Sequence, residues 1–493
     1  MITEHLPALQ VVLPLLAAPI CFIILNNRLS WLFATLVSWV TFAISIMLVL
    51  ETRNGDVLHY AFGGWEPPWG IEYTVDTLSS YVLLIVSGIA ALVFPYSWTS
   101  IQKEIPKTHH RLFLTAMMLC MAGLLGMTIT GDAFNLFVLL EISSLSSYTL
   151  ISLGRDRRAL TSSFQYLIMG TVGATFILIG VGLLYVLTGT LNMADLAERI
   201  ANIEESRTLQ AAFAFLLVGF GLKLAMFPLH LWLPNAYAFA PSAVSAFIGS
   251  TATKVAIYAL LRFLFTIFGI KFSFDSMQVH WLLMPLAVIS IMFASLVAIF
   301  QDGTKRILAY SSVAQIGYML LGISLLTETA LTATLLHLFN HALMKGGLFL
   351  AIGAIAYRAG GTRLEFLPGL GKAMPYSMAA FTVGVLSLIG VPLTVGFISK
   401  WYLILATLEK EYWILTIIIL ISSLMAVIYT WRILEKAYFQ PRPADAPAIK
   451  EAPLSLLIPT WILIGANLFF GIYSEHSIEL ASNAAKLLLG GAL

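Results

Sequence analysis

The sequence predicts an all-α polytopic membrane protein with about fourteen transmembrane helices. Of the 493 residues, 59% are hydrophobic and only 11% are charged, and the mean hydropathy is +0.90. Soluble proteins carry about 25% charged residues. The apolar residues form fourteen runs of the length that a bilayer requires, which is about 20 residues, and two of the longest runs are interrupted by proline and glycine. The net charge of +2 gives no reason to expect a nucleic-acid partner.

The fourteen runs follow one another with short polar connections. The first run has no basic residues before it, which predicts a helix that stays in the protein rather than a cleaved signal. The polar stretch 435–452 before the last run is expected to be a cytoplasmic loop. The runs are 7–25, 30–50, 76–98, 111–130, 132–153, 161–188, 210–238, 242–267, 280–300, 303–325, 330–357, 376–407, 412–434 and 453–473.

The lysine and arginine residues of the loops predict the orientation. Sixteen of the 27 fall in loops on one side of the membrane, seven on the other side and four inside the runs. Since cytoplasmic loops carry the excess of positive charge, both termini are predicted outside, in a cell inner (plasma) membrane. Arg262 is counted among the outer loops. Asp302, Lys305 and Arg306 are expected to form a solvated turn in the cytoplasm.

The run 210–238 carries Lys223 near its middle, followed by helix breaks expected at Pro228 and Pro234. A lysine at the centre of a transmembrane helix costs roughly 2.5–3.5 kcal/mol, and an interior proline removes a helical hydrogen bond. These features are tolerated where a helix faces protein or a hydrated cavity. The alternative is that Lys223 extends its ammonium group to an interface.

The run 376–407 has a similar composition, with a break expected at Pro392 between two glycines and with Lys400 after it. The two broken runs are five helices apart and cross in opposite directions, as an inverted repeat would produce. We therefore expect four regions. These are N-terminal helices 1–3 (1–110), a first five-helix repeat (111–267), a second five-helix repeat (280–438), and a cytoplasmic loop with helix 14 (439–493).

Glu141 lies near mid-depth in its own run and predicts a partner for Lys223. A buried carboxylate is costly unless it is paired, and Lys223 lies at a comparable depth in the next broken run. Two readings remain open. The pair either fixes the packing of two helices, or it opens and closes so that Lys223 exchanges a proton.

Three further basic positions lie inside apolar runs. Lys254 has only apolar and small neighbours, while His337, His341 and Lys345 are spaced by four residues and therefore share one face of a helix. Two imidazoles and a lysine in one stripe predict a proton wire. Histidines at this spacing can also bind zinc, but no acidic residue or HExxH pattern accompanies them.

His230, two residues after Pro228, either lines a cavity or makes a structural hydrogen bond. The sequence has no phosphate-binding, dinucleotide-binding or cysteine-cluster motif. The two cysteines, Cys21 and Cys120, lie in separate runs. We expect no catalytic residue, no cofactor and no metal.

Five blocks in this order resemble the signature segments of the proton-translocating, antiporter-like membrane subunits of complex I, membrane-bound hydrogenases and Mrp-type antiporters. The blocks are GDAFNLFVLLEISSLSSY, FPLHLWLPNAYAFAPSAVSAF, TKRILAYSSVAQIGY, HLFNHALMKGGLFL and GVPLTVGFISKW. The resemblance covers about residues 76–438. It implies fourteen helices with two inverted repeats, and its proton-translocation residues correspond here to Glu141, Lys223, Lys254, His337, His341 and Lys400.

Chain length and lysine at position 400 are most similar to the D subunit of the Mrp-type Na+/H+ antiporter. The expectation is a proton-translocating subunit of a multisubunit monovalent cation/proton antiporter, with other membrane subunits, lipid, protons and a cation as partners. The alternative is a proton-pumping membrane subunit of a complex I-like oxidoreductase or a membrane-bound hydrogenase. In both cases the chain is a transporter subunit, and any redox chemistry would belong to other subunits.

Overall fold

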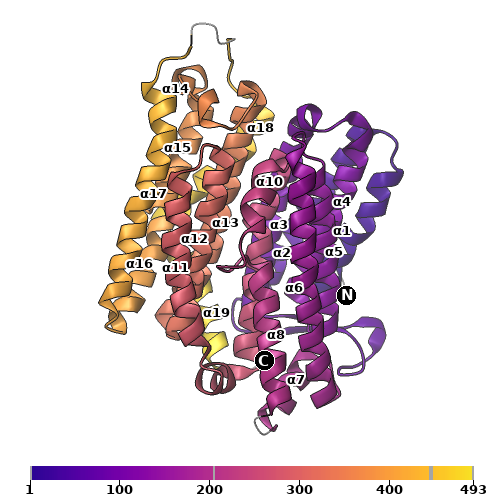
Figure 1. Cartoon of the computed structure of the whole chain (residues 1–493). Coiled ribbons are helices and arrows are strands. Elements are labelled where there is room, and N and C mark those ends of the chain that lie inside the picture. Colours follow the sequence, from indigo (N-terminus) through magenta and orange to yellow (C-terminus); the bar gives the residue numbers. More distant parts are fainter. Residues whose placement is uncertain (1–2, 204–205, 444–447, 491–493) are drawn as a thin grey trace.

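The computed structural model describes residues 3–203, 206–443 and 448–490 (Figure 1). The fold is almost entirely helical. In chain order the elements are η1 (Thr3–His5), α1 (Leu6–Ile23), α2 (Asn27–Thr52), β1 (Leu58–Ala61), η2 (Phe62–Gly64), β2 (Glu72–Val75), α3 (Thr77–Glu104), η3 (Lys107–His109), α4 (His110–Ile129), α5 (Ala133–Ser152), α6 (Arg158–Thr188), α7 (Met193–Ala201), α8 (Arg207–Lys223), α9 (Trp232–Phe239), α10 (Ser242–Leu261), η4 (Arg262–Ile267), η5 (Lys271–Ser276), α11 (Val279–Ile299), α12 (Thr304–Leu325), α13 (Glu328–Ala359), η6 (Leu364–Phe366), α14 (Leu370–Ala373), α15 (Pro375–Ile389), α16 (Val395–Glu409), α17 (Trp413–Phe439), α18 (Leu454–Ile472) and α19 (Glu475–Gly490).

Twelve helices in the described part of the chain are long and apolar enough to cross a membrane. They coincide with twelve of the fourteen predicted runs. The two predicted runs that are not among these twelve are 210–238 and 376–407, the runs with expected breaks. The structure therefore confirms a polytopic helical protein with twelve candidate spans, and it divides each of the other two runs into two shorter helices.

The helices differ in how much of their surface is covered by protein. The apolar windows of α10, α12 and α13 are each 94% buried, whereas those of α2, α6, α11 and α17 are 33–39% buried. The first half of the chain lies on one side of the molecule and the second half on the other (Figure 1), and α10 packs against α13 where the halves meet. Lys254 and Lys345 thus lie on the two helices that join the halves.

The break between α8 and α9 spans residues 224–231. It is closed by hydrogen bonds that satisfy the carbonyls at the end of α8, including one from the Trp232 indole N–H to the Leu222 carbonyl at 3.0 Å. Ala225 adopts φ 61°, a left-handed conformation that costs a non-glycine residue about 1–3 kcal/mol. Pro228 lies in the break as predicted. Pro234 does not, because it occupies the first turn of α9, where proline is tolerated.

The break between α15 and α16 spans residues 390–394 and includes Pro392, as predicted. Here Gly390 has φ 93° and Leu393 has φ 71°. Each break thus contains one non-glycine residue in the left-handed region. Such strain persists only where the surrounding structure holds it.

Three elements have no counterpart in the predicted runs. β1 and β2 form an antiparallel hairpin, α7 is a short amphipathic helix, and α19 follows the last span and packs against α13 and α3. We call the face that carries β1, β2 and α7 the hairpin face; it lies at the lower end of Figure 1, opposite α14. The loop expected at 435–452 begins only after α17 ends at Phe439, and its residues 444–447 lie outside the described residues.

Two basic residues that were expected in loops are buried. Arg262 continues α10 and pairs with the Asp76 carboxylate at 2.5 Å. Lys305, expected in a solvated turn, is 5% exposed and donates to the Ala240 carbonyl at 2.9 Å. Both predictions were wrong because each partner lies far away in the sequence, where a count of loop charges does not detect it.

Candidate functional site

Glu141 of α5 and Lys223 at the end of α8 form the predicted pair. The Lys223 Nζ lies 3.3 Å from Glu141 Oε1 and 2.9 Å from Ser144 Oγ, one turn further along α5. The side chains are 5% exposed for the lysine and 22% for the glutamate. The carboxylate therefore retains contact with its surroundings while the ammonium group is enclosed, and Ser144 offers the ammonium a second acceptor.

Lys254 of α10 is fully buried. Its Nζ donates to the Gly249 carbonyl at 2.6 Å and lies 3.4 Å from Thr253 Oγ1. In the described part of the chain Lys254 forms no ion pair. A lysine ammonium has three N–H donors and no counter-charge here, so its positive form is held by neutral dipoles alone.

The stripe on α13 consists of His337, His341 and Lys345, all buried. The two imidazole rings stack at 6.0 Å with an angle of 9° between them. His337 Nδ1 lies 2.8 Å from the Ser399 hydroxyl, which connects the stripe to α16. His337 Nε2 and both ring nitrogens of His341 have no hydrogen-bond partner among the described residues.

Lys345, at the other end of the stripe, points into α12. Its Nζ donates to the Leu308 carbonyl at 2.6 Å and the Ser311 hydroxyl at 2.5 Å. The glycines that follow do not bend the helix, since α13 is continuous through them. A Cβ on Gly346 would lie 3.2 Å from Ser250 Oγ of α10, so this glycine allows α13 to approach α10 closely.

Lys400 of α16 is held by the end of the preceding helix. Its Nζ donates to the carbonyls of Leu388 and Ile389, the last residues of α15, at 3.2 and 2.9 Å, and to the Ser423 hydroxyl at 3.1 Å. The last carbonyls of a helix lack helical partners and carry partial negative charge. The break therefore supplies the negative pole for Lys400 that Glu141 supplies for Lys223.

These groups form a row across the middle of the molecule. The charges of Lys254 and Lys345 act on both stacked histidines, and the charge of Lys400 acts on His337. Imidazole and amine groups can each accept and release a proton. Because a charge at one position raises the electrostatic cost of a charge at the next, a row of this kind can pass protons one at a time.

His230 remains an open case. It is 1% exposed and stacks on Phe227 at 5.3 Å, but neither ring nitrogen has a partner among the described residues. The hydrogen bond that the sequence offered as one reading is not formed.

The sequence reasoning overlooked the hydroxyl groups that contact the lysines and the stripe, Ser144, Ser311, Ser399 and Ser423. Three of these serines belong to pairs of adjacent serines inside apolar runs. That pattern could have identified Ser144, Ser311 and Ser423, whereas Ser399 has no such signal.

The comparisons with known proteins agree with one another. Residues 130–426 match the family model described as NADH:quinone oxidoreductase/Mrp antiporter, transmembrane. A relative named as the N subunit of an NADH-quinone oxidoreductase, from Desulforudis audaxviator, is 39% identical, with 97% of each chain covered. A relative named as the D subunit of a Na(+)/H(+) antiporter, from Bacillus subtilis, is 30% identical, with 98% of this chain and 96% of the relative covered.

Two solved structures have the same fold over nearly the whole chain. A chain of the Mrp complex from Dietzia sp. superposes with a TM-score of 0.91 at 27% identity, with 99% of this chain and 98% of that chain covered. A chain of the membrane-bound sulfane sulfur reductase, an archaeal respiratory membrane complex, superposes with a TM-score of 0.90 at 28% identity, with 98% of each chain covered. Both are subunits of multisubunit membrane complexes.

Proposed function

Because the chain belongs to the NADH:quinone oxidoreductase/Mrp antiporter family of transmembrane proteins, we propose that it is the proton-translocating subunit of a multisubunit monovalent cation (Na+)/proton antiporter. The observation that carries the proposal is the buried row of basic groups from Lys223 to Lys400. Lys254, Lys345 and Lys400 are each held by carbonyls and hydroxyls. A static scaffold gains nothing from three enclosed ammonium groups without counter-charges.

Protons move through this row in steps, and each residue has a role. Glu141 and Lys223 form a pair that opens and closes at one end, Lys254 and the α13 stripe connect the two halves, and Lys400 is the other end. The membrane potential is worth about 2.3 kcal/mol per charge per 100 mV. That is close to the roughly 2.5–3.5 kcal/mol cost of one lysine at mid-depth, so the arrival of one proton can reset the next pairing.

The two broken helices complete the membrane crossings in this proposal. The pair α8 and α9 and the pair α15 and α16 each form one further span, which brings the twelve candidate spans to fourteen. The two pairs cross in opposite directions within two inverted five-helix repeats, residues 111–267 and 280–438. With the basic loops in the cytoplasm, both termini and the hairpin face lie outside the plasma membrane.

A second candidate function has its own support. The relative named as an oxidoreductase subunit is 39% identical, compared with 30% for the relative named as an antiporter subunit. In this case the same row pumps protons for a complex I-like oxidoreductase whose redox chemistry belongs to other subunits. Purification of the native complex separates the two, since co-purifying iron–sulfur subunits would establish the second function and their absence, together with Na+-dependent proton flux, the first.

Substitution of Lys400 tests the transport role itself. Lys400→Arg keeps the positive charge and the donors but does not release its proton under physiological conditions. We expect cation-dependent proton uptake by inside-out vesicles to fall to background at matched expression. Lys372→Arg, at an exposed position in α14, serves as the control and is expected to transport normally. Transport by Lys400→Arg at the wild-type rate would show that Lys400 is only a structural charge.

A further inference from the structure

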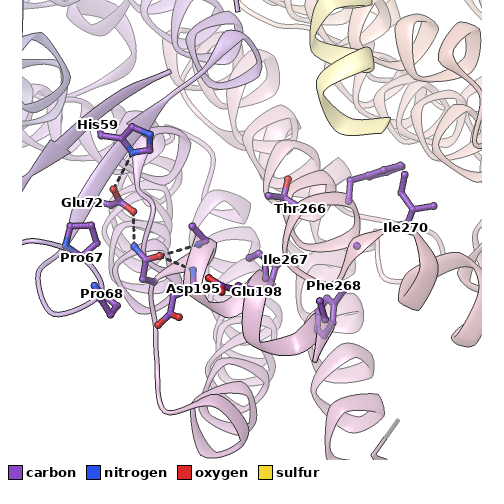
Figure 2. Close-up of a pocket in the computed structure, with 16 residues that line it drawn as sticks. His59, Pro67, Pro68, Glu72, Asp195, Glu198, Thr266, Ile267, Phe268 and Ile270 are labelled. Carbon is purple, nitrogen blue, oxygen red and sulfur yellow. Dashed lines mark hydrogen bonds and ion pairs between the residues drawn. The ribbon is translucent and has the colours of Figure 1, made fainter. Parts of the chain in front are cut away.

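A large cavity opens on the hairpin face, away from the helix breaks. Its volume is about 840 Å³. As Figure 2 shows, His59 and Glu72 of the hairpin lie on one side, Asp195 and Glu198 of α7 below them, and the segment from Thr266 to Ile270 across from them. The proton route proposed above does not account for this cavity.

Glu72 is the enclosed acid of this cavity, 5% exposed. Its carboxylate accepts from Asn192 Nδ2 at 2.6 Å and lies 3.2 Å from His59 Nδ1, whose ring is largely exposed. The backbone around it is tied together, since Gly131 N–H donates to the Glu72 carbonyl at 3.0 Å. A Cβ on Gly131 would lie 2.9 Å from Glu72 Cγ, so the glycine keeps the space beside this side chain open.

A second, smaller cavity continues inward from Glu72. Its volume is about 30 Å³, and it is lined by Glu72, Thr130, Tyr258 and Arg262 among others. A polar cavity needs about 10–15 Å³ to hold one water molecule and two to four polar partners to keep it. This cavity satisfies both conditions, so water can connect the Glu72 carboxylate with the Tyr258 hydroxyl.

Arg262 fixes the wall of the inner cavity. Burial opposes the charge of Asp76, but the Arg262 guanidinium holds the pKa of the Asp76 carboxyl below its usual value. The Arg262 Nε donates to the Tyr258 hydroxyl at 3.0 Å, and that hydroxyl donates to the Thr128 carbonyl at 2.7 Å. The ion pair is thus a permanent anchor, and Glu72 is the carboxyl that remains available for proton exchange.

Tyr258 and Lys254 are four residues apart on α10 and share one face of the helix, separated by about 6 Å along its axis. The Lys254 ammonium points the other way, to Gly249, five residues towards the start of α10. Rotation of this side chain would exchange the Gly249 carbonyl for the Tyr258 side. The connection from the cavity to the row is therefore open or closed according to where Lys254 points.

We propose that the hairpin-face cavity is the solvent opening of the first half of the proton route, with Glu72 and Tyr258 as the groups that connect it to Lys254. The inference rests on the proposed function and deepens it, because it assigns an opening to one side of the row. Protonated Glu72 releases its proton to water in the inner cavity. The Tyr258 oxygen accepts a proton as its own hydrogen moves on to neutral Lys254, which becomes ammonium.

A cysteine at position 266 tests the opening, because Thr266 lines both cavities. In the purified complex reconstituted into vesicles, a bulky membrane-impermeant cationic thiol reagent is added from the hairpin face. Thr266→Cys is expected to transport normally before labelling and to lose at least 90% of its proton flux afterwards. The native Cys21 and Cys120 are buried, and wild type treated with the reagent shows any effect of modifying them.

Ala201→Cys is the matched control, because Ala201 lines the outer cavity only. It is expected to be labelled equally and to retain its flux, since the outer cavity is too large for one label to fill. Complete labelling at position 266 without loss of flux would overturn the proposal. Failure of the reagent to reach position 266 would overturn it as well.

A pair of carboxyl substitutions gives an independent readout. Glu72→Gln keeps an acceptor for Asn192 but cannot exchange the proton, and we expect a tenfold or larger loss of flux. Glu198→Gln, at the rim of the outer cavity, is expected to have no effect. If Glu72→Gln does not assemble, the thiol experiment decides.

Lys400→Arg measured in the same preparation separates the two claims. Normal flux in Glu72→Gln with an inactive Lys400→Arg would refute the opening and leave the transport function standing. Normal flux in Lys400→Arg would instead refute the route itself.

Discussion

The pair of Glu141 and Lys223 allows a switch to be distinguished from a structural ion pair. At 3.3 Å and an effective dielectric constant of about 20, the attraction between two unit charges is about 5 kcal/mol. Removal of one partner from a buried pair typically costs about 3–5 kcal/mol, because the other charge is left unpaired. Lys223 keeps its hydrogen bond to Ser144, so Glu141→Gln should fall near the lower end of that range.

The informative variant removes both charges. Glu141→Gln combined with Lys223→Met leaves no unpaired ion, and we expect it to be more stable than either single variant. Transport should be absent in all three variants, because none of them has an ammonium group at position 223 that is paired with a carboxylate. Stability is measured by denaturant unfolding in mixed micelles, and transport by cation-dependent proton uptake in vesicles.

The control is the exposed pair of Arg363 and Glu365, 3.6 Å apart with both side chains more than 60% exposed. Exposed ion pairs contribute little to stability, so Glu365→Gln should change neither readout. Recovery of stability together with transport in the double variant would refute the switch and leave a pair that only fixes packing. Flux near the wild-type level in correctly assembled Glu141→Gln would refute it directly.

Three further predictions follow from particular residues. Gly390→Ala should abolish flux, because φ is 93° there and the added Cβ would lie 3.1 Å from Lys400 Cδ; flux and melting temperature are measured together, and a normal flux would contradict this geometry. A cysteine at position 156 should be labelled only from the cytoplasm and one at position 203 only from outside, and the opposite pattern would reverse the orientation. Asp76→Asn should destabilise the protein at neutral pH, because the low pKa of Asp76 contributes stability above its unfolded pKa of about 3.9. The difference from wild type should shrink as the pH falls below about 4, and a difference that does not depend on pH would show that the aspartate contributes by packing alone.

Much of the fold could be predicted because membrane helices must satisfy their backbone internally and present apolar side chains. Run 330–357, for example, corresponds to α13 at Glu328–Ala359. The hairpin, α7 and α19 were missed because short or amphipathic elements lack this signal. Pro234 was misplaced because proline is compatible with the first turn of a helix as well as with a break.

The charged residues show where sequence reasoning reaches its limit. The pairing of Glu141 with Lys223 was predicted from the cost of two isolated charges at similar depth. Arg262 was assigned to a loop because it ends an apolar run, and its partner Asp76 is 186 residues away. The carbonyls that hold Lys400 could not be predicted either, since their availability depends on where α15 ends.

The central claim is that one continuous row of buried basic groups conducts the protons, and the pair Lys254 and Lys400 tests it most directly. Cation-dependent proton uptake is measured in inside-out vesicles for Lys254→Met, Lys400→Met and the double variant, with expression matched by immunoblot. In a serial route any single interruption stops the flux, so all three variants should be equally inactive. Substantial flux in both single variants that is lost only in the double variant would mean two parallel paths and would contradict the row.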